Sequence, residues 1–352
     1  MNSWKDNVRR VAPYTPGEQP KTGGFIKLNT NENPYPPAPG VQKLAEELAS
    51  ERLRLYPDAD SSKLCKALAD YYGFAPENIF AGVGSDDVLG MAFMTFFNSD
   101  KPVLFPKISY SFYPVWAEML RIPYECTRLA DDYHLIVEDF CRENGGIVIA
   151  NPNAPTSLCE PLSVVRDILE HNPDSVVIVD EAYVDFGGES ALPLLAEFPN
   201  LLVVRTFSKS RSMAGLRIGF AIGSAEMIGY LNDVKNSYNS YTMNYYAQAL
   251  GEESVREDEY FRETLRKVVE TREWAAKELA ARGFSFPKSS TNFLFVTHPE
   301  ISAKDLFVYL KEHKVLVRYF ATEELKDRLR ITVGTPEEMQ ALLDVIDEYR
   351  SK

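Results

Sequence analysis

A single lysine, Lys209, stands between two serines in "RTFSKSRSMAGLRIGF" (205–220), directly after the apolar run "NLLVVRTF". An amine at the end of a buried strand can bond covalently to an aldehyde. Arg217 follows eight residues later, and its planar guanidinium group can bind a phosphate. This stretch therefore predicts a site that combines an amine with an anion.

Two other predicted strands end in groups with complementary chemistry. "SVVIVD" ends in Asp180 and is followed by Tyr183, and "NIFAGVG" is followed by Ser85 and Asp86 at the start of a helix. Ligands of open α/β sheets bind beyond the carboxyl ends of the strands, and the free N–H groups of a helix start suit a phosphate. We therefore expect an amine, a carboxylate and an anion site to meet at one edge of the sheet.

One cofactor, pyridoxal 5'-phosphate (PLP), requires this set of groups. Its aldehyde requires a lysine, its ring nitrogen requires an acid in order to stay protonated, and its phosphate requires hydrogen-bond donors. Lys209 and Asp180 meet the first two requirements, and Arg217 with Ser208 and Ser85 can meet the third. The order and spacing of these residues carry the prediction, because each residue type alone is common at strand ends.

Competing motifs lack the residues that their chemistry needs. "GVGSDD" has neither the Lys-Ser/Thr of a P-loop nor the third glycine of a dinucleotide fingerprint, and no G-x-S-x-G elbow is present. "DEAYVDF" offers two aspartates without an accompanying histidine, and the four cysteines and four histidines have no metal-ligand spacing. The sequence therefore predicts no metal site.

Bulk composition excludes several partners. The 352 residues include 38 basic and 51 acidic side chains, and the net charge of -13 repels nucleic acid. The beginning of the chain has no apolar signal region, and no stretch approaches the roughly 18 apolar residues of a membrane helix. We expect a soluble cytoplasmic protein with reduced cysteines.

The elements that would position these residues follow an α/β pattern. From about residue 60 to 245, continuous apolar runs alternate with helical segments, which is typical of a mostly parallel sheet covered by helices on both faces. We predict an N-terminal arm and small-domain segment over 1–40, a three-layer α/β/α domain over 41–245, and a smaller α+β domain over 246–352.

In the predicted small domain, one long charged helix ends at Gly283, and "STNFLFVTH", "VLVRYF" and "LRITVGT" read as strands. Thr335, Pro336 and Glu338 start the last helix with a capping box. The first 35 or so residues are rich in proline and asparagine, and we expect them to lie against this domain or its cleft.

These motifs together resemble a known family. The segments "RRVAPYTPG", "IKLNTNENPYPP", "RLYPD", "GVGSDD", "PKISYSFYP", "NPNAPTS", "VDEAYVDF", "RTFSKSRSMAGLRIGF", "STNFLF" and "LRITVGTPEE" occur in the order found in class II members of the fold-type I PLP-dependent aminotransferases. The resemblance spans almost the whole chain. It implies a homodimer that moves an amino group from a phosphate-bearing amine to a 2-oxo acid.

The resemblance also implies individual roles. Lys209 would bond to the cofactor and move the substrate proton, Asp180 would partner the pyridine nitrogen, and Tyr183 would donate to the ring 3'-oxygen. The further cofactor-binding residues that it implies are Ser85, Asp86, Tyr110, Ser208, Arg217 and, from the neighbouring subunit, Tyr56. The substrate-binding residues that it implies are Tyr14, Asn33, Arg318 and Arg330.

One segment departs from the family pattern. The family often reads N-P-N-N-P-T-G at this point. This chain has Ala154 in place of the asparagine before the second proline, and Ser157 in place of the glycine. Alanine cannot bond the cofactor 3'-oxygen, so either Asn153 replaces it through a small shift of the turn or Tyr183 acts alone. Asn153 is therefore included among the expected cofactor-binding residues.

Proteins with three other functions have sequences similar to this one. A PLP-dependent decarboxylase of threonine phosphate and an aromatic amino-acid aminotransferase would share the scaffold and nearly all the motifs. A non-catalytic PLP-binding module occurs fused to transcription regulators, and the acidic charge of this chain disfavours that alternative. Release of carbon dioxide without any need for an oxo acid would identify the decarboxylase.

Overall fold

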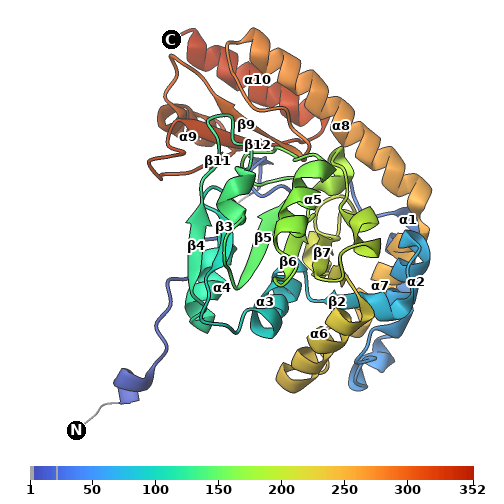
Figure 1. Ribbon diagram of the computed structural model, residues 1–352. Coiled ribbons are helices and arrows are strands. Elements are labelled where there is room, and N and C mark those ends of the chain that lie inside the picture. Colours follow the sequence, from blue (N-terminus) through green and yellow to red (C-terminus); the bar gives the residue numbers. More distant parts are fainter. Residues whose placement is uncertain (1–3, 21–22) are drawn as a thin grey trace.

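A seven-stranded sheet forms the centre of the computed structural model, which describes residues 4–20 and 23–352 (Figure 1). Its strand order is β2-β8-β7-β6-β5-β3-β4, and only β8 runs antiparallel to its neighbours. The strands are β2 (Ile79–Gly82), β3 (Val103–Pro106), β4 (Tyr124–Thr127), β5 (Gly146–Ala150), β6 (Val177–Asp180), β7 (Leu201–Thr206) and β8 (Gly219–Ile222). The predicted α/β fold with a mostly parallel sheet is confirmed.

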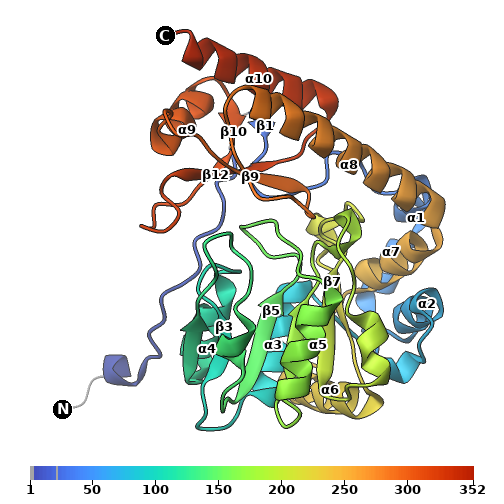
Figure 2. The ribbon, with the colours of Figure 1, turned by 45° about the horizontal axis from the view of Figure 1, so that its top comes forward.

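Helices cover both faces of this sheet, as Figure 2 shows. Successive side chains of a strand point to opposite faces, so Ile178 of β6 packs with α3 (Ser85–Phe96), α4 (Phe112–Leu120) and α6 (Ala225–Tyr238). Val177 and Val179 pack on the other face with α5 (Leu162–His171). This double burial explains why the strands are continuous apolar runs.

A third cluster covers the β2–β8 side of the sheet, where α1 (Pro39–Glu47), α2 (Ser62–Tyr72) and α7 (Tyr245–Arg256) pack together. Gly73 ends α2 with a φ of 77°, the left-handed conformation that is typical of a glycine after the last turn of a helix.

A smaller lobe holds the rest of the chain. Its three-stranded antiparallel sheet has the order β11-β12-β9 and packs against α8, α9 and α10. The bounds are α8 (Asp258–Ala281), β9 (Phe293–Thr297), α9 (Ala303–Glu312), β10 (Val315–Leu316), β11 (Arg318–Tyr319), β12 (Arg328–Thr332) and α10 (Pro336–Arg350). Thr335 and Glu338 form the predicted capping box at the start of α10.

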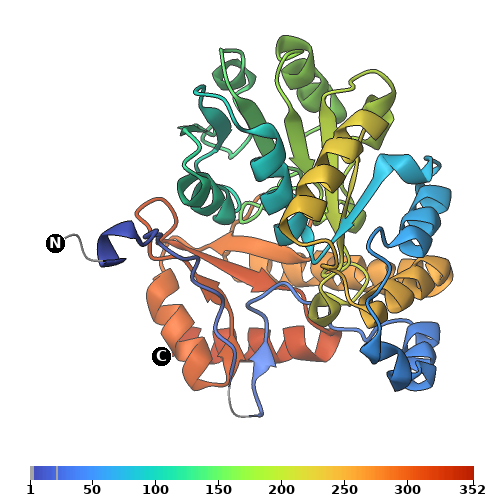
Figure 3. The ribbon, with the colours of Figure 1, turned by 90° about the horizontal axis from the view of Figure 1, so that it is seen from below.

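The part of the N-terminal segment around β1 (Ile26–Lys27) lies along this lobe, as expected (Figure 3). β1 pairs in parallel with β10, which is far away in the sequence (Figure 2). The domain boundaries at residues 40 and 245 stay predictions.

Two elements differ from the sequence expectation. The predicted long helix is broken at Glu257, because α7 packs against α1 and α2 of the large lobe whereas α8 continues to α10 and β9 of the small one. The segment "VLVRYF" is divided at Val317, because β10 pairs with β1 and β11 pairs with β12. The helix α8 has 24 residues, but many of them are charged. Over residues 4–20 and 23–352, no helix has the length and apolar character needed to cross a membrane.

Candidate active site

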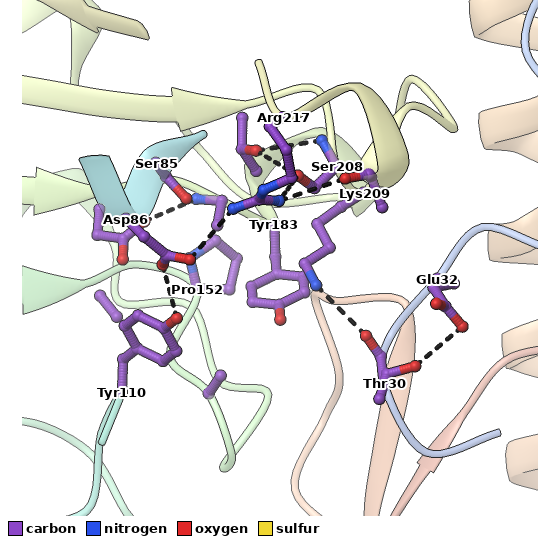
Figure 4. A pocket seen from close by; sticks show the side chains of 16 residues that line it. Thr30, Glu32, Ser85, Asp86, Tyr110, Pro152, Tyr183, Ser208, Lys209 and Arg217 are labelled. Atoms are coloured by element: carbon purple, nitrogen blue, oxygen red, sulfur yellow. Dashed lines mark hydrogen bonds and ion pairs between the residues drawn. The ribbon is translucent and has the colours of Figure 1, made fainter. Parts of the chain in front are cut away.

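Two adjoining cavities lie between the large sheet and the small lobe. The first has a volume of about 160 Å³ and is drawn in Figure 4. The second is equally large and shares Thr30, Tyr110, Ala154, Tyr183 and Lys209 with the first. Of the residues predicted for the site, the first cavity is lined by Ser85, Asp86, Tyr110, Asp180, Tyr183, Ser208, Lys209 and Arg217, and the second by Tyr14, Tyr110, Tyr183, Lys209, Arg318 and Arg330.

Lys209 stands between the two cavities. It follows β7, and its Nζ donates to the carbonyl oxygen of Thr30 at 3.4 Å (Figure 4). Asn33 does not line either cavity. Instead its Nδ2 donates to the backbone oxygens of Lys209 and Ser210, both at 3.2 Å, and so holds the loop that carries the lysine. The amine is therefore presented to the cavities from a loop fixed by a side chain of the N-terminal segment.

Asp180 provides a buried carboxylate at the end of β6, next to β7 in the sheet. Its Oδ2 accepts a hydrogen bond from Tyr113 OH at 2.9 Å, and its Oδ1 accepts one from the backbone N–H of Ala182 at 3.2 Å. Burial raises the pKa of Asp180 to about 6. Among the residues lining the first cavity, the cations Lys209 and Arg217 bond to other groups, so a cationic ring nitrogen would supply the partner that this carboxylate lacks.

The raised pKa predicts a pH-dependent stability for the cofactor-free protein. Between about pH 4 and pH 6 the folded state binds more protons at Asp180 than the unfolded state does, so the free energy of unfolding falls as the pH rises through this window. Asparagine stays neutral and can still bond Tyr113 and Ala182. We expect Asp180→Asn to raise the free energy of unfolding by about 2–3 kcal/mol at pH 7.5, a gain that disappears near pH 4. Urea unfolding of both proteins at pH 7.5 and at pH 4 measures this difference in the free energy of unfolding. An equal difference at both pH values would contradict a raised pKa of Asp180.

A cradle for an anion is formed where β2 meets α3. Gly84 has a φ of 85°, and a Cβ atom at this position would lie 2.5 Å from Nη2 of Arg217, so only glycine lets the arginine approach. Nη1 of Arg217 donates to Oγ of Ser208 at 3.4 Å. The backbone N–H groups of Ser85 and Asp86 in the first turn of α3 complete a site suited to a phosphate.

The side chain of Asp86 pairs with two other residues of the site. Its Oδ1 accepts a hydrogen bond from Tyr110 OH at 2.7 Å, and its Oδ2 pairs with Nη2 of Arg217 at 3.2 Å (Figure 4). Burial, followed by the charge of Asp86, raises the pKa of Tyr110, so this phenol stays protonated. The carboxylate thus orients Tyr110 and Arg217, and the backbone N–H of Asp86 is the group suited to the phosphate.

The phenol of Tyr183 faces both cavities, and its partner is a residue that sequence reasoning missed. Its oxygen accepts a hydrogen bond from Nδ2 of Asn31 at 2.8 Å. Asn153 lines neither cavity: Ser109 donates to its Oδ1, and its Nδ2 donates to the carbonyl oxygen of Ile108 and to Oγ1 of Thr156. Of the two expected possibilities, the geometry favours Tyr183 without Asn153.

The second cavity is cationic. Arg318 and Arg330 are directly opposite each other on β11 and β12. Nη2 of Arg330 donates to the carbonyl oxygen of Asn29 at 3.1 Å, and Nη2 of Arg318 donates to that of Thr15 at 3.4 Å. The residues lining this cavity include no aspartate or glutamate in the described part of the chain, and burial lowers the pKa of Arg330.

Two predicted tyrosines lie at very different distances from the site. Tyr14 lines the second cavity and stacks on Phe112, with ring centroids 4.4 Å apart. Tyr56 is 82% exposed, stacks on Tyr241 at 4.6 Å and lines neither cavity of its own chain. No group of three or more His, Cys, Asp or Glu residues that could hold a metal ion occurs among the described residues.

Known proteins resemble this chain over nearly its full length. Residues 24–346 match the family model described as aminotransferase class I and II. The chain is 52% identical over 347 residues to the histidinol-phosphate aminotransferase of Lactococcus lactis subsp. cremoris (strain SK11), covering 99% of this chain and 98% of that protein. It is 47% identical over 349 residues to a protein of the same name from Clostridium botulinum, covering 99% of both.

Solved structures share the fold. The histidinol-phosphate aminotransferase of Sinorhizobium meliloti in complex with pyridoxal-5'-phosphate has a TM-score of 0.83 and 24% identity, over 92% of this chain and 91% of that one. The histidinol-phosphate aminotransferase of Clostridium acetobutylicum has a TM-score of 0.85 and 20% identity, over 92% and 99% of the two chains.

Proposed function

Because the chain belongs to the class I and II aminotransferases, we propose that it is a histidinol-phosphate aminotransferase of histidine biosynthesis. It transfers the amino group of histidinol phosphate to 2-oxoglutarate, and the products are imidazole-acetol phosphate and glutamate. The full-length identity to relatives of that name supports the substrate.

The residues of the first cavity suit PLP as the cofactor. A buried carboxylate without a cationic partner, an accessible amine and a glycine-lined cradle with Arg217 match the ring nitrogen, the aldehyde and the phosphate. When bound, PLP supplies the carbonyl carbon that takes up the amino group and a ring that withdraws electrons from it. Ser85, the backbone of Asp86, Ser208 and Arg217 would hold the phosphate.

The side chains of this protein would bind and orient the cofactor and would transfer the substrate proton. Lys209 Nζ would hold the cofactor and would move the proton of the substrate α-carbon, since it faces both cavities. Asp180 would keep the ring nitrogen protonated, and the phenol of Tyr183 would donate a hydrogen bond to the cofactor 3'-oxygen. Tyr110 contributes an aromatic wall that Asp86 orients.

The arginine pair is the observation that carries the substrate assignment. Like charges directly opposite each other on paired strands repel, and no carboxylate lines this cavity among the described residues. A bound anion relieves this repulsion. Histidinol phosphate brings a phosphate and glutamate brings carboxylates, so both partners can use the same two guanidinium groups in turn.

An assay of the purified protein against a panel of amino donors with 2-oxoglutarate tests this function. We expect histidinol phosphate to have the highest kcat/KM, above that of aromatic amino acids. An aromatic amino acid as the best donor would make the protein an aromatic aminotransferase. Carbon dioxide release from threonine phosphate would make it a decarboxylase.

The protein also acts as a homodimer in this proposal. Leu53, Leu55 and Tyr56 form an exposed apolar group on and after a 3-10 helix (Ser50–Arg54), next to Tyr241. An exposed group of this kind is typical of an interface. Tyr56 would then contact the cofactor phosphate of the neighbouring subunit, which explains why it is remote from the cavities of its own chain.

Mixed dimers test this arrangement. In a heterodimer of one Tyr56→Phe subunit and one Lys209→Ala subunit, both defects fall in one site and the other site is intact. We expect about half of the wild-type activity, which exceeds that of either variant homodimer. Two affinity tags isolate the heterodimer for the assay. Activity no higher than that of the homodimers would place both residues in one site and remove the cross-subunit role.

A further inference from the structure

Asn31 is a buried residue with a side chain that reaches the phenol of Tyr183. Nδ2 of Asn31 lies 2.8 Å from the phenol oxygen, and Asn31 is only 1% exposed. We propose that Asn31 is a positioning residue for the reaction proposed above: its amide directs the proton of Tyr183 into the cavity. The inference rests on the proposed function, because it assigns the phenol proton to the cofactor.

The hydrogen bonds around Asn31 fix which way its amide faces. The backbone N–H of Asn31 donates to Oγ1 of Thr332 at 3.0 Å, so the hydroxyl proton of Thr332 is free to donate to Oδ1 of Asn31 at 3.1 Å. If the amide were flipped, two donors would face the Thr332 oxygen and its proton would lose this acceptor. Nδ2 therefore faces Tyr183 as a donor.

The backbone of Asn31 is held as firmly as its side chain. Its φ is 56°, a left-handed conformation that asparagine tolerates better than most residues. Its carbonyl oxygen accepts a hydrogen bond from Nδ2 of Asn292 at 3.0 Å. With both ends bonded, the amide cannot turn away from the phenol.

A donor on the phenol oxygen decides where the phenol proton goes. Because Nδ2 has no lone pair to offer, the O–H of Tyr183 must point elsewhere, and the phenol borders both cavities. Donation to the oxygen also strengthens the O–H as a donor. Apart from Tyr183, the residues of the first cavity that come from β5, β6 and the loops after them are Asp180, whose carboxylate accepts hydrogen bonds, and four without a polar side chain: Ala150, Pro152, Ala154 and Ala182. Tyr183 is thus the donor on this wall, and Asn31 sets its direction.

The same strand holds the substrate arginine and the anchor of Asn31. Arg330 and Thr332 are two residues apart on β12 and so share one face of the strand. Arg330 bonds the backbone of Asn29, and Thr332 bonds Asn31. The anion site and the Tyr183 contact are therefore built on one rigid unit.

The test replaces the amide donor by an acceptor. In Asn31→Asp the carboxylate accepts a hydrogen bond from the phenol O–H, so the cofactor 3'-oxygen loses a donor that favours its anionic form. We expect the pH midpoint of the visible absorption band of the PLP-loaded protein to rise by about 1 unit. The dissociation constant of PLP, measured by titrating the cofactor-free protein, is expected to rise about 10-fold or more. Asn31→Ala, which removes the donor without adding a charge, should shift both quantities in the same direction by a smaller factor.

Two controls distinguish a role of Asn31 in positioning Tyr183 from an effect of the substitution on the stability of the protein. Asn172→Asp alters a buried amide that bonds Asn144 and Ile168 after α5, away from the cavities, and should leave the pH midpoint unchanged even if it lowers the melting temperature. In a Tyr183→Phe background, Asn31→Asp should cause no further rise of the midpoint, because Asn31 acts through the phenol.

The outcomes are distinct. A wild-type protein that binds no PLP would refute the proposed function itself. A wild-type protein with normal binding and turnover, together with Asn31 variants whose midpoint and PLP affinity are unchanged, would overturn the role of Asn31 alone. The same conclusion would follow if Asn172→Asp moved the midpoint equally, or if Asn31→Asp kept its full effect without the phenol.

Discussion

The Lys209→Ala protein is expected to lose turnover by at least about 10²–10⁴-fold, because it lacks both the proton-transfer group and the covalent attachment point of the cofactor. Lys209 lines both cavities, and its strand is next to the strand that ends in Asp180. Borohydride treatment of the PLP-loaded wild type should fix the cofactor to Lys209, and peptide mass spectrometry locates the adduct. The variant should yield no adduct.

Lys27→Ala is the matched control for this experiment. Nζ of Lys27 donates to Oγ1 of Thr30 at 2.8 Å and also pairs with Glu32, so this amine lies close to the site but its partners hold it in place. We expect the control to keep its adduct at Lys209. An adduct at another lysine in the Lys209→Ala protein, or unchanged turnover, would refute the assignment.

Arg330→Ala is expected to lower kcat/KM for both histidinol phosphate and glutamate by roughly 10-fold to 100-fold. Charge-assisted hydrogen bonds contribute about 1.5–3 kcal/mol each, and Arg330 is partly buried with its Nε unpaired among the described residues. Arg330→Lys should restore only part of the loss, because an ammonium group lacks the planar pair of donors. Arg318→Ala should have the smaller effect of the two, since Arg318 bonds only weakly to Thr15 at 3.4 Å.

Arg328→Ala supplies the control for the arginine experiment. Arg328 is on the same strand, but its guanidinium group packs on Tyr133 and Phe295 and it lines neither cavity. The kcat/KM values of the Arg328→Ala protein for both substrates should stay within about twofold of those of the wild type, as is usual for substitutions outside the site. Unchanged values for both substrates in Arg330→Ala would eliminate the shared anion site.

The sequence predicts the large sheet and much of the first cavity because the chemistry lies at strand ends. Strands buried on both faces are continuous apolar runs, so the positions of Asp180 and Lys209 at the ends of two such runs place them at one edge of the sheet. The glycine before Ser85 marks the helix start that forms the anion cradle. These features depend on the local sequence, from which the periodicity of apolar residues predicts strands and helices.

Long-range contacts explain what the sequence does not predict. Asn31 and Asn33 belong to one asparagine-rich segment, and only the pairing of that segment with Thr332 decides that Asn31 reaches Tyr183 while Asn33 turns to the Lys209 loop. Tyr113, the donor to Asp180, follows Tyr110 by three residues, and the residue types alone do not tell the two phenols apart. The break at Glu257 follows from the docking of α7 and α8 on different lobes.

The reaction itself is tested most directly by the stoichiometry of histidinol-phosphate turnover. The purified PLP-loaded protein is supplied with histidinol phosphate and 2-oxoglutarate, and imidazole-acetol phosphate, glutamate and carbon dioxide are quantified together. We expect one glutamate for each imidazole-acetol phosphate, no carbon dioxide, and no sustained turnover without 2-oxoglutarate. Absence of glutamate, or carbon dioxide release from threonine phosphate without any oxo acid, would contradict this expectation.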